Sequence, residues 1–440
     1  MENLIVELSK YIIIILVTIY TLYCFTAFRG NDKKRKNRVF RAQSLIMYFI
    51  HFICYMLIFM DSNNIKVLIL YLVEVVFFIG AHLLYRVIYR NLSRLVFNNM
   101  LMLLMFSFVM LTRLSFDQAV KQFTYAAVSM GICLFIPMII DRFRFLDKFG
   151  WIYGGTGLLL LVIVKKFGTM NYGATNWIKI GSIAIQPSEF VKILFVFAIA
   201  ALLSKSIEFK DIIKVTILAA AHVLVLVLER DLGGALIFFV TYLVMLFVAT
   251  ANPFYFIGGL LSGSFASVVA YRLFNHVRVR VMAWKNPWKL IDNQGYQVTQ
   301  SLFAIGTGGW FGMGLGRGLP GDIPVVESDF IFSAISEELG GITALCIILI
   351  CISCYIMFVN IAMKIKKRFY KYVALGLGTI YVFQVFLTIG GVTKFIPSTG
   401  VTLPLISAGG SSILSTIIIF GIIQGLYVHN QNEDVKNVRD

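Results

Sequence analysis

The segment YIIIILVTIYTLYCFTAF, residues 11–28, contains no charged side chain and decides the class of the fold. An α-helix rises about 1.5 Å per residue, so a run of this length crosses most of the roughly 30 Å hydrocarbon core of a membrane. Similar apolar runs recur along the chain. The 440 residues are 59% hydrophobic and 14% charged, with a mean hydropathy of +0.84. Soluble domains are about half apolar and about a quarter charged, so we predict a polytopic membrane protein.

The length and continuity of the apolar runs predict helices. A transmembrane β-barrel would show alternating segments of about ten residues instead. We therefore expect an all-α fold with thirteen spans, at residues 8–28, 44–60, 66–85, 95–112, 124–140, 149–165, 188–205, 212–228, 233–250, 253–274, 329–363, 370–391 and 409–428. The eleventh run is too long for one crossing, so its first part is expected to be a polar lead-in. The N-terminal MENLIVELSK lacks the features of a signal peptide, and we expect no cleavage.

Lysine and arginine predict the orientation. Basic intervals such as RGNDKKRKNRVFR (29–41) and KIKKRFYK (364–371) follow odd-numbered spans, whereas DSNN (61–64) on the other side carries little charge. We expect the N-terminus outside, the C-terminus in the cytoplasm and the long loop 276–328 outside. Cytoplasmic loops facing anionic membrane lipids account for most of the net charge of +17. Without a soluble basic domain, nucleic acid is not an expected partner.

Cysteine and histidine carry little information about function. All six cysteines lie within expected spans, where thiols behave as small apolar groups. No metal-ligand spacing occurs among the cysteines and histidines. The informative residues lie in four polar or glycine-rich stretches, all expected to meet the outer side of the membrane.

The first stretch is NYGATNWIKIGSIAIQPSEFVK, residues 171–192. Its Gly, Asn, Pro and Ser residues predict a loop, and Pro187 is tolerated in the first turn of the next helix. Glu189 and Lys192 are three positions apart, so they share a helix face and can pair as they enter the membrane. A helix cap with an interfacial ion pair, or the polar wall of a substrate cavity, explains this pattern.

The second stretch, LERDLGGAL at 228–236, predicts a very tight link between two spans. A solvated turn accounts for Glu229 and Arg230. Asp231 is expected to cap the following helix, and the glycines after it permit close helix packing. The sequence favours a structural role here.

The third stretch is GYQVTQSLFAIGTGGWFGMGLGRGLPGDIPVVESDFIFSAISEELGG, residues 295–341. Its density of glycine indicates unusual backbone angles or a close approach, and the interleaved Trp310 and Phe311 argue against a merely flexible linker. We expect a folded element at the membrane interface. Asp329, Glu337 and Glu338 follow in an otherwise apolar span, where ionised carboxylates need partners.

The fourth stretch is TIGGVTKFIPSTGVTLPLISAGGSS, residues 388–412. Two prolines and five glycines interrupt what would otherwise be helix, and Lys394 lies among them. Irregular backbone at membrane depth is tolerated where it is buried in protein or lines a wet cavity. The pattern favours a re-entrant cavity wall over a simple turn.

Taken in order, the blocks NWIKIG, QPSEFVK, RDLGGAL, GYQVTQSLFAIGTGGWFGMGLG, SDFIFSAISEELG and IPSTGVTLPLISAGGSS resemble the SEDS family of bacterial cell-wall proteins, which includes FtsW, RodA and SpoVE. The resemblance covers roughly residues 95–428. It implies a ten-helix core with both ends cytoplasmic. It also implies a peptidoglycan glycosyltransferase that polymerises lipid II at the outer face of the bacterial cytoplasmic membrane, in division, elongation or sporulation, with a class B penicillin-binding transpeptidase as partner.

On this basis we expect an extra three-helix transmembrane segment at 1–92, a SEDS-like core at 93–430 and a cytoplasmic tail at 431–440. The chain departs from the family pattern in further ways. The common RWI reads NWI here, so Asn176 removes one cation. The essential acid of the family falls on Leu290, and the nearest acid is Asp292, two residues further on. We carry the catalytic role to Asp292.

The expected chemistry needs particular side chains. A sugar hydroxyl attacks an anomeric carbon that bears a polyprenyl diphosphate, and a carboxylate such as Asp292 takes the hydroxyl proton. Cations, or a divalent ion such as Mg²⁺ or Mn²⁺, must hold the departing diphosphate. The candidate cations are Lys192, Arg278, Arg280, Lys285, Lys289, Arg317 and Lys394, and the other substrate-binding candidates are Glu189, Gln297 and Ser407. Supporting positions are expected at Pro187, Asp231, Asp329, Glu337, Glu338, Pro397, Gly400, Gly409 and Gly410.

Two other classes of function remain open at this point. A transporter or lipid flippase would also need embedded charges and broken helices, but internal repeats would be expected and none are seen between the halves. A non-catalytic scaffold of a cell-wall synthesis complex would keep only partner contacts. The Leu290 departure keeps that alternative open, because a docking scaffold tolerates the loss of its catalytic acid.

Overall fold

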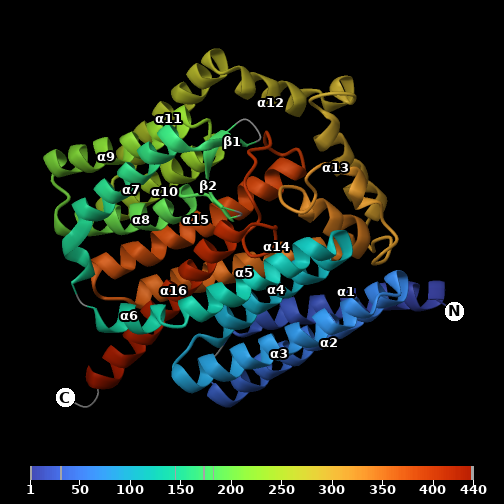
Figure 1. Cartoon of the computed structure of the whole chain (residues 1–440). Coiled ribbons are helices and arrows are strands. Elements are labelled where there is room, and N and C mark those ends of the chain that lie inside the picture. Colours follow the sequence, from blue (N-terminus) through green and yellow to red (C-terminus); the bar gives the residue numbers. More distant parts are fainter. Residues whose placement is uncertain (1, 30–31, 144, 172–173, 182, 438–440) are drawn as a thin grey trace.

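The structure is a computed structural model, and it describes residues 2–29, 32–143, 145–171, 174–181 and 183–437. It is almost entirely helical (Figure 1). The helices are α1 (Glu2–Thr26), α2 (Lys33–Ser62), α3 (Ile65–Ile88), α4 (Arg94–Leu114), α5 (Phe116–Cys133), α6 (Ile136–Arg142), α7 (Gly150–Phe167), α8 (Ser188–Lys205), α9 (Phe209–Leu228), α10 (Leu232–Thr250), α11 (Pro253–Leu273), α12 (Asn275–Lys285), α13 (Tyr296–Gly308), α14 (Ile331–Lys364), α15 (Arg368–Val392) and α16 (Gly410–Asn437). Short 3₁₀ turns are η1 (Leu146–Phe149), η2 (Pro287–Leu290) and η3 (Pro320–Asp322).

The prediction of an all-α polytopic membrane protein is confirmed. Within the described part of the chain, 12 helical segments are long and apolar enough to cross a membrane. Every expected span coincides with a helical segment, and the expected span missing from those 12 is α8. Its composition sets it apart, because α8 carries Glu189, Lys192 and Lys205. The chain is therefore a multi-pass membrane protein.

The stretch before α8 was expected to be a loop, and this expectation was wrong. It forms a small antiparallel sheet of β1 (Thr169–Asn171), β2 (Ala174–Ile180) and β3 (Ile183–Ile185), in the order β1-β2-β3. Ile178 pairs with Ile185 and Lys179 with Ala184. The backbone N–H of Thr175 on β2 donates to the Glu229 carbonyl at 2.9 Å, so the sheet is held against the α9–α10 turn.

The three helices α1–α3, drawn in blue, lie together at one edge of the molecule beside α4 (Figure 1). Polar side chains tie them to that helix. Glu74 of α3 is fully buried, with its carboxylate 2.8 Å from His51 Nε2 and accepting a 2.7 Å hydrogen bond from the Tyr55 hydroxyl. Tyr55 in turn lies 2.9 Å from the Thr112 hydroxyl on α4. Glu74 thus finds its partners inside the bundle.

The glycine-rich stretch packs against a break in α14. Gly340 has φ 87° and ψ 162°, which interrupts the 34-residue helix. The loop donates Met313 N–H to the Glu337 carbonyl at 2.9 Å and Gly314 N–H to the Glu338 carbonyl at 3.0 Å. In return, Gly341 N–H donates to the Gly309 carbonyl at 2.8 Å. The close approach of two backbones, and not flexibility, explains the glycines.

Both acids of this region find partners. The Glu338 carboxylate is fully buried and accepts a 3.1 Å bond from Arg113 Nε of α4. The Glu337 carboxylate accepts the Leu319 backbone N–H at 3.0 Å. These side chains therefore brace the loop against α14 and α4.

We expect Gly340→Ala to lower the free energy of unfolding by roughly 2–5 kcal/mol, because its backbone angles are nearly exclusive to glycine. A Cβ there would lie 2.5 Å from Gly312 N and 2.6 Å from Trp310 O. Thermal unfolding of the detergent-solubilised protein measures the effect. Gly321→Ala is the matched control, since nothing lies within 4 Å of its Cβ position. Equal melting temperatures for the two variants would contradict the packing argument.

Candidate functional site

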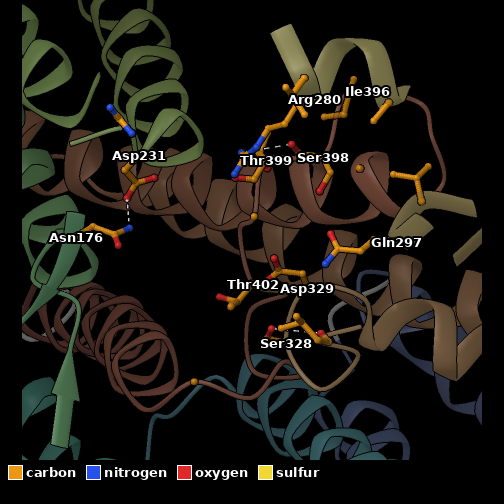
Figure 2. A pocket seen from close by; sticks show the side chains of 18 of the residues that line it. Asn176, Asp231, Arg280, Gln297, Ser328, Asp329, Ile396, Ser398, Thr399 and Thr402 are labelled. Carbon is orange, nitrogen blue, oxygen red and sulfur yellow. Dashed lines mark hydrogen bonds between the residues drawn. The ribbon is translucent and has the colours of Figure 1, made fainter. Parts of the chain in front are cut away.

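A cavity of about 480 Å³ opens where β2, the α9–α10 turn, α12, α13 and the 388–412 segment converge (Figure 2). Its wall combines polar and charged side chains with apolar ones. The lining residues from the first half of the chain are Asn176, Trp177, Gln186, Arg230 and Asp231. Those from the long loop and α14 lead-in include Arg280, Trp284, Gln294, Gln297, Ser328 and Asp329, and those from the 388–412 segment include Ile396, Ser398, Thr399, Gly400, Thr402, Gly409 and Ser412.

Asp231 forms one wall of the cavity and is fixed by its neighbours. Its Oδ1 accepts the Gly234 backbone N–H at 2.8 Å, which caps α10 as the sequence predicted. Its Oδ2 accepts a 3.1 Å bond from the Asn176 carboxamide on β2 (Figure 2). Asn176 therefore holds this carboxylate in place. The cap positions an acid inside the cavity.

Arg280 on α12 and Asp329, just before α14, both line the cavity. Arg280 Nη1 donates to the Thr399 carbonyl at 3.0 Å, so α12 is tied to the 388–412 segment (Figure 2). Burial raises the pKa of the Asp329 carboxyl, while a hydrogen bond from Ser328 and the Arg280 charge lower it. Burial also lowers the pKa of Arg280, and Asp329 and Asp231 oppose that change. The guanidinium therefore lies in the field of both cavity acids.

Gly400 fits between these two groups. It has φ 72°, and a Cβ there would lie 3.7 Å from both Arg280 Nη2 and Asp329 Oδ2. Because it has no side chain, Gly400 leaves open the space beside the Asp329 carboxylate and the Arg280 guanidinium. This is one of the positions where the re-entrant segment requires a residue without a side chain.

Glu189 and Lys192 form the predicted ion pair beneath the cavity. Lys192 Nζ lies 2.7 Å from Glu189 Oε2 and donates to Gln384 Oε1 on α15 at 2.9 Å. Ser415 on α16 donates to Glu189 at 2.7 Å. Both charged residues line a small adjoining cavity of about 40 Å³ that shares Gln186, Asp231, Gly400 and Thr402 with the main one. The pair thus links three helices under the site.

The structure brings several predicted residues into the main cavity and leaves others outside. Arg280, Gln297, Asp231, Asp329, Gly400 and Gly409 line it. Arg278 and Lys285 are exposed and lie outside the lining. Lys394 also lies outside it, and its backbone carbonyl accepts a 3.1 Å hydrogen bond from Trp284 Nε1. Lys289, Arg317, Pro187, Pro397, Gly410, Glu337 and Glu338 also lie outside the lining. Ser407 is buried, where its hydroxyl accepts the Leu403 N–H at 2.8 Å and donates to the Ser328 carbonyl.

Asp292 is exposed in the turn between η2 and α13 and does not line the cavity. Gln294 and Gln297, two and five positions further on, do line it. Asp292 is therefore close in sequence to the lining but not part of it, and the acids that line the cavity are Asp231 and Asp329.

Arg230 is a charged cavity residue that was not predicted, since a solvated turn was expected there; the polar lining residues Gln186, Gln294, Ser328, Thr399, Thr402 and Ser412 were not predicted either. Arg230 lines the cavity and has φ 65°. The sequence does contain a signal for this residue. A three-residue turn between two helices often needs one residue with left-handed backbone angles, and glycine is favoured there. An arginine at that place stands out.

Glu229, beside Arg230, is a buried acid whose two carboxylate oxygens have no hydrogen-bond partner among the described residues. Burial raises the pKa of this carboxyl to about 8, with Asp231 adding to the rise and Lys165 opposing it. Between the ordinary value of 4.5 and about 8, the unfolded chain loses its proton before the folded chain does. Stability from this group is complete at low pH and falls as the pH rises through that window.

We therefore expect Glu229→Gln to raise the melting temperature at pH 8.5 by a few degrees, because the glutamine stays neutral. At pH 4.5 the variant and the wild type should melt together. Melting in detergent across this pH range is the measurement. Glu208→Gln, at an exposed carboxylate, serves as the control and should show no such pH dependence. A constant difference at all pH values would mean that Glu229 does not titrate as described.

Comparison with known proteins identifies the family. The sequence model described as "Cell cycle protein", for FtsW, RodA and SpoVE, matches residues 92–432. The chain belongs to the FtsW/RodA/SpoVE family. It is 36% identical over 321 residues to "Peptidoglycan glycosyltransferase RodA" of Mycobacterium leprae, covering 69% of each chain. It is 35% identical over 278 residues to "Stage V sporulation protein E" of Bacillus subtilis, covering 60% of this chain and 75% of the relative.

Solved structures share the fold of this family member. A chain from a peptidoglycan synthase complex that coordinates polymerization and crosslinking aligns with a TM-score of 0.65 at 24% identity, covering 77% of this chain and 98% of the other. Rod shape determining protein RodA of Thermus thermophilus aligns with a TM-score of 0.55 at 23% identity, covering 76% and 96%. The family match begins at residue 92, so α1–α3 lie outside it.

Proposed function

We propose that this FtsW/RodA/SpoVE-family protein is a peptidoglycan glycosyltransferase that joins lipid II units into glycan strands at the outer face of the cytoplasmic membrane. The observation that carries the proposal is the polar cavity, which is built from all four of the sequence blocks that characterise the chain. Relatives of the chain are named as peptidoglycan glycosyltransferases. The N-terminus is then outside and the C-terminus cytoplasmic, following the distribution of lysine and arginine.

The reaction transfers a glycan chain between oxygen atoms. A sugar hydroxyl of the acceptor attacks the anomeric carbon of the donor, a new C–O bond forms, and the bond to the diphosphate breaks with its electron pair leaving on oxygen. A carboxylate accepts the hydroxyl proton. We assign this role to Asp292, which is exposed and meets an acceptor that enters from outside. Arg280, held by the Thr399 carbonyl, is placed to bind the departing diphosphate.

A divalent cation such as Mg²⁺ or Mn²⁺ fits the chemistry of the cavity. Mg²⁺ is commonly held by one or two carboxylates together with substrate phosphates, and Asp231 and Asp329 are the two acids of the lining. Among the described residues no group of three or more His, Cys, Asp or Glu side chains could hold a metal. When bound with substrate, the cation would supply positive charge to the diphosphate, and Asp231 and Asp329 would hold it.

A class B penicillin-binding transpeptidase is the proposed protein partner. One structural relative belongs to a complex that coordinates polymerization and crosslinking, and newly made strands are the substrate that a crosslinking enzyme needs. Membrane lipids contact the exposed apolar faces of the helices. Residues of α11 illustrate such a face, since none of its residues is buried.

The test is polymerisation of labelled lipid II by the purified full-length protein with its cognate transpeptidase and Mg²⁺ or Mn²⁺. Glycan strands longer than the disaccharide are expected, with less product when the divalent ion is chelated. Strand synthesis by an active family member in parallel validates the substrate. An inactive protein beside that control would favour a scaffold. Lipid II crossing into the inner leaflet of vesicles without polymer would favour a flippase.

A further inference from the structure

The backbone of Arg230 adopts a conformation that is unfavourable for its side chain. It lies in the three-residue link between Leu228 at the end of α9 and Leu232 at the start of α10. Its φ of 65° falls in the left-handed region, where glycine is favoured and long side chains are disfavoured. Its N–H donates to the Val227 carbonyl at 3.0 Å, so hydrogen bonding holds this turn. Such outliers concentrate at functional sites.

The cations of the cavity wall are few. Among the described residues that line it, the positively charged ones are Arg230 and Arg280. Lys192 belongs to the adjoining cavity and is occupied by Glu189 and Gln384. No ion pair to Arg230 is found in the part of the chain that the structure describes, and Arg230 is exposed and lines the cavity.

Arg230 and Arg280 line the same cavity. His276 of α12 has its pKa lowered by burial and then by the positive charges of Arg280 and Arg230. The His276 imidazole therefore lies in the electrostatic field of both guanidinium groups, that of Arg280 on α12 and that of Arg230 in the α9–α10 link. The next residue, Asp231, accepts hydrogen bonds from Gly234 and Asn176, and no ion pair between Asp231 and Arg230 is found among the described residues.

We propose that Arg230 is a second anion-binding residue of the cavity and that it holds, together with Arg280, the diphosphate of a prenyl-diphosphate-linked sugar. This inference rests on the proposed function for the identity of the ligand. Each planar guanidinium can form two parallel hydrogen bonds to phosphate oxygens, so the two arginines match the two phosphates of the leaving group. The strained turn is retained because glycine at position 230 would relieve the backbone and remove the cation.

Binding of undecaprenyl diphosphate in detergent micelles tests the proposal directly. We expect Arg230→Gly to weaken binding about tenfold, as the loss of one charge-assisted contact implies, while its melting temperature stays equal or rises. Arg230→Lys should recover part of the affinity. Ala251→Gly relieves a similar left-handed position, φ 52° at the end of α10 and outside the cavity lining, and should leave binding unchanged. Lys166→Gln controls for an exposed cation outside the lining.

Three ligands separate the possible sources of the anion. Undecaprenyl monophosphate and inorganic pyrophosphate should bind more weakly than the lipid diphosphate, and pyrophosphate should show the same dependence on Arg230. An equal effect of Arg230→Gly on phosphatidylglycerol vesicles would overturn the proposal, because Arg230 would then be a general contact for anionic lipid. Unchanged binding of the lipid diphosphate by Arg230→Gly would also overturn it.

The inference and the proposed function fail in different ways. If the wild type polymerises lipid II and Arg230→Gly binds the lipid diphosphate normally, only the role of Arg230 is wrong. If binding depends on Arg230 but the wild type makes no strands, the anion site stands and the enzyme assignment is wrong.

Discussion

Asp292→Ala is expected to lower the rate of glycan-strand synthesis at least a hundredfold while the affinity for the lipid-linked donor stays the same. General base catalysis contributes about 10²- to 10⁴-fold, and the residue proposed to bind the donor's diphosphate is Arg280, not Asp292. Because the side chain is exposed, the melting temperature should change little. Polymerisation rate at saturating lipid II, measured together with donor binding, separates these effects.

Two further variants make this result specific. Asp322→Ala removes another exposed acid of the same loop, outside the cavity lining, and should retain activity. Asp329→Asn removes the acid that faces Arg280, so it should weaken donor binding more than it slows the bound enzyme. If Asp292→Ala polymerises normally and Asp329→Asn is inactive with donor still bound, the base is the buried Asp329.

Lys192→Met is expected to destabilise the protein by about 3–5 kcal/mol and to abolish strand synthesis. Removing one partner of a buried ion pair leaves the other charge uncompensated, and Lys192 is only 2% exposed. Glu189 would keep Ser415 as its remaining partner, and α15 would lose the contact through Gln384. Unfolding in detergent, with fluorescence-detected size-exclusion chromatography to confirm a folded sample, measures the change.

The exposed pair Asp211–Lys214 has the same spacing and serves as the matched control. Its Nζ–Oδ1 distance is 2.8 Å and its lysine side chain is 61% exposed, so Lys214→Met should change stability by no more than about 1 kcal/mol. In the double variant Glu189→Gln/Lys192→Met, most of the lost stability should return, because no lone charge remains. Equal destabilisation by Lys192→Met and Lys214→Met would show that the Lys192 pair is effectively solvated.

Hydrophobic length made the helices predictable, because the bilayer imposes one physical requirement on every span. α8 was found despite its charges, since the run after Lys192 is apolar. The sheet was missed because its strands are only three to seven residues long. Turn-forming residues around them dominated the pattern. The sheet is also held by a contact with a turn that is distant in sequence, the hydrogen bond from Thr175 to Glu229. Such a contact cannot be predicted from the local sequence pattern.

Several residues of the site could be predicted from the sequence, but not which of them lie together in the cavity. Asp231, Arg280 and Gln297 were singled out by residue type and place, and the fold brings them together. Lys285 and Arg278 had equal claims from the sequence, yet their side chains lie outside, because α12 is a helix and presents only one face to the cavity. Arg230 was expected in a solvated turn, and its left-handed φ of 65° became evident only in the structure.

The buried asparagines of α4 bear on how the protein is made. Asn98 donates to Gln43 and to the Phe40 carbonyl, and Asn99 accepts from Tyr20, so α4 takes its polar partners from α1 and α2. Those helices precede α4 in the chain and leave the ribosome first. α4, the first helix of the family core, therefore takes its hydrogen-bonding partners from helices that are made before it. A chain without α1 and α2 would leave Asn98 and Asn99 of α4 without these partners inside the bundle.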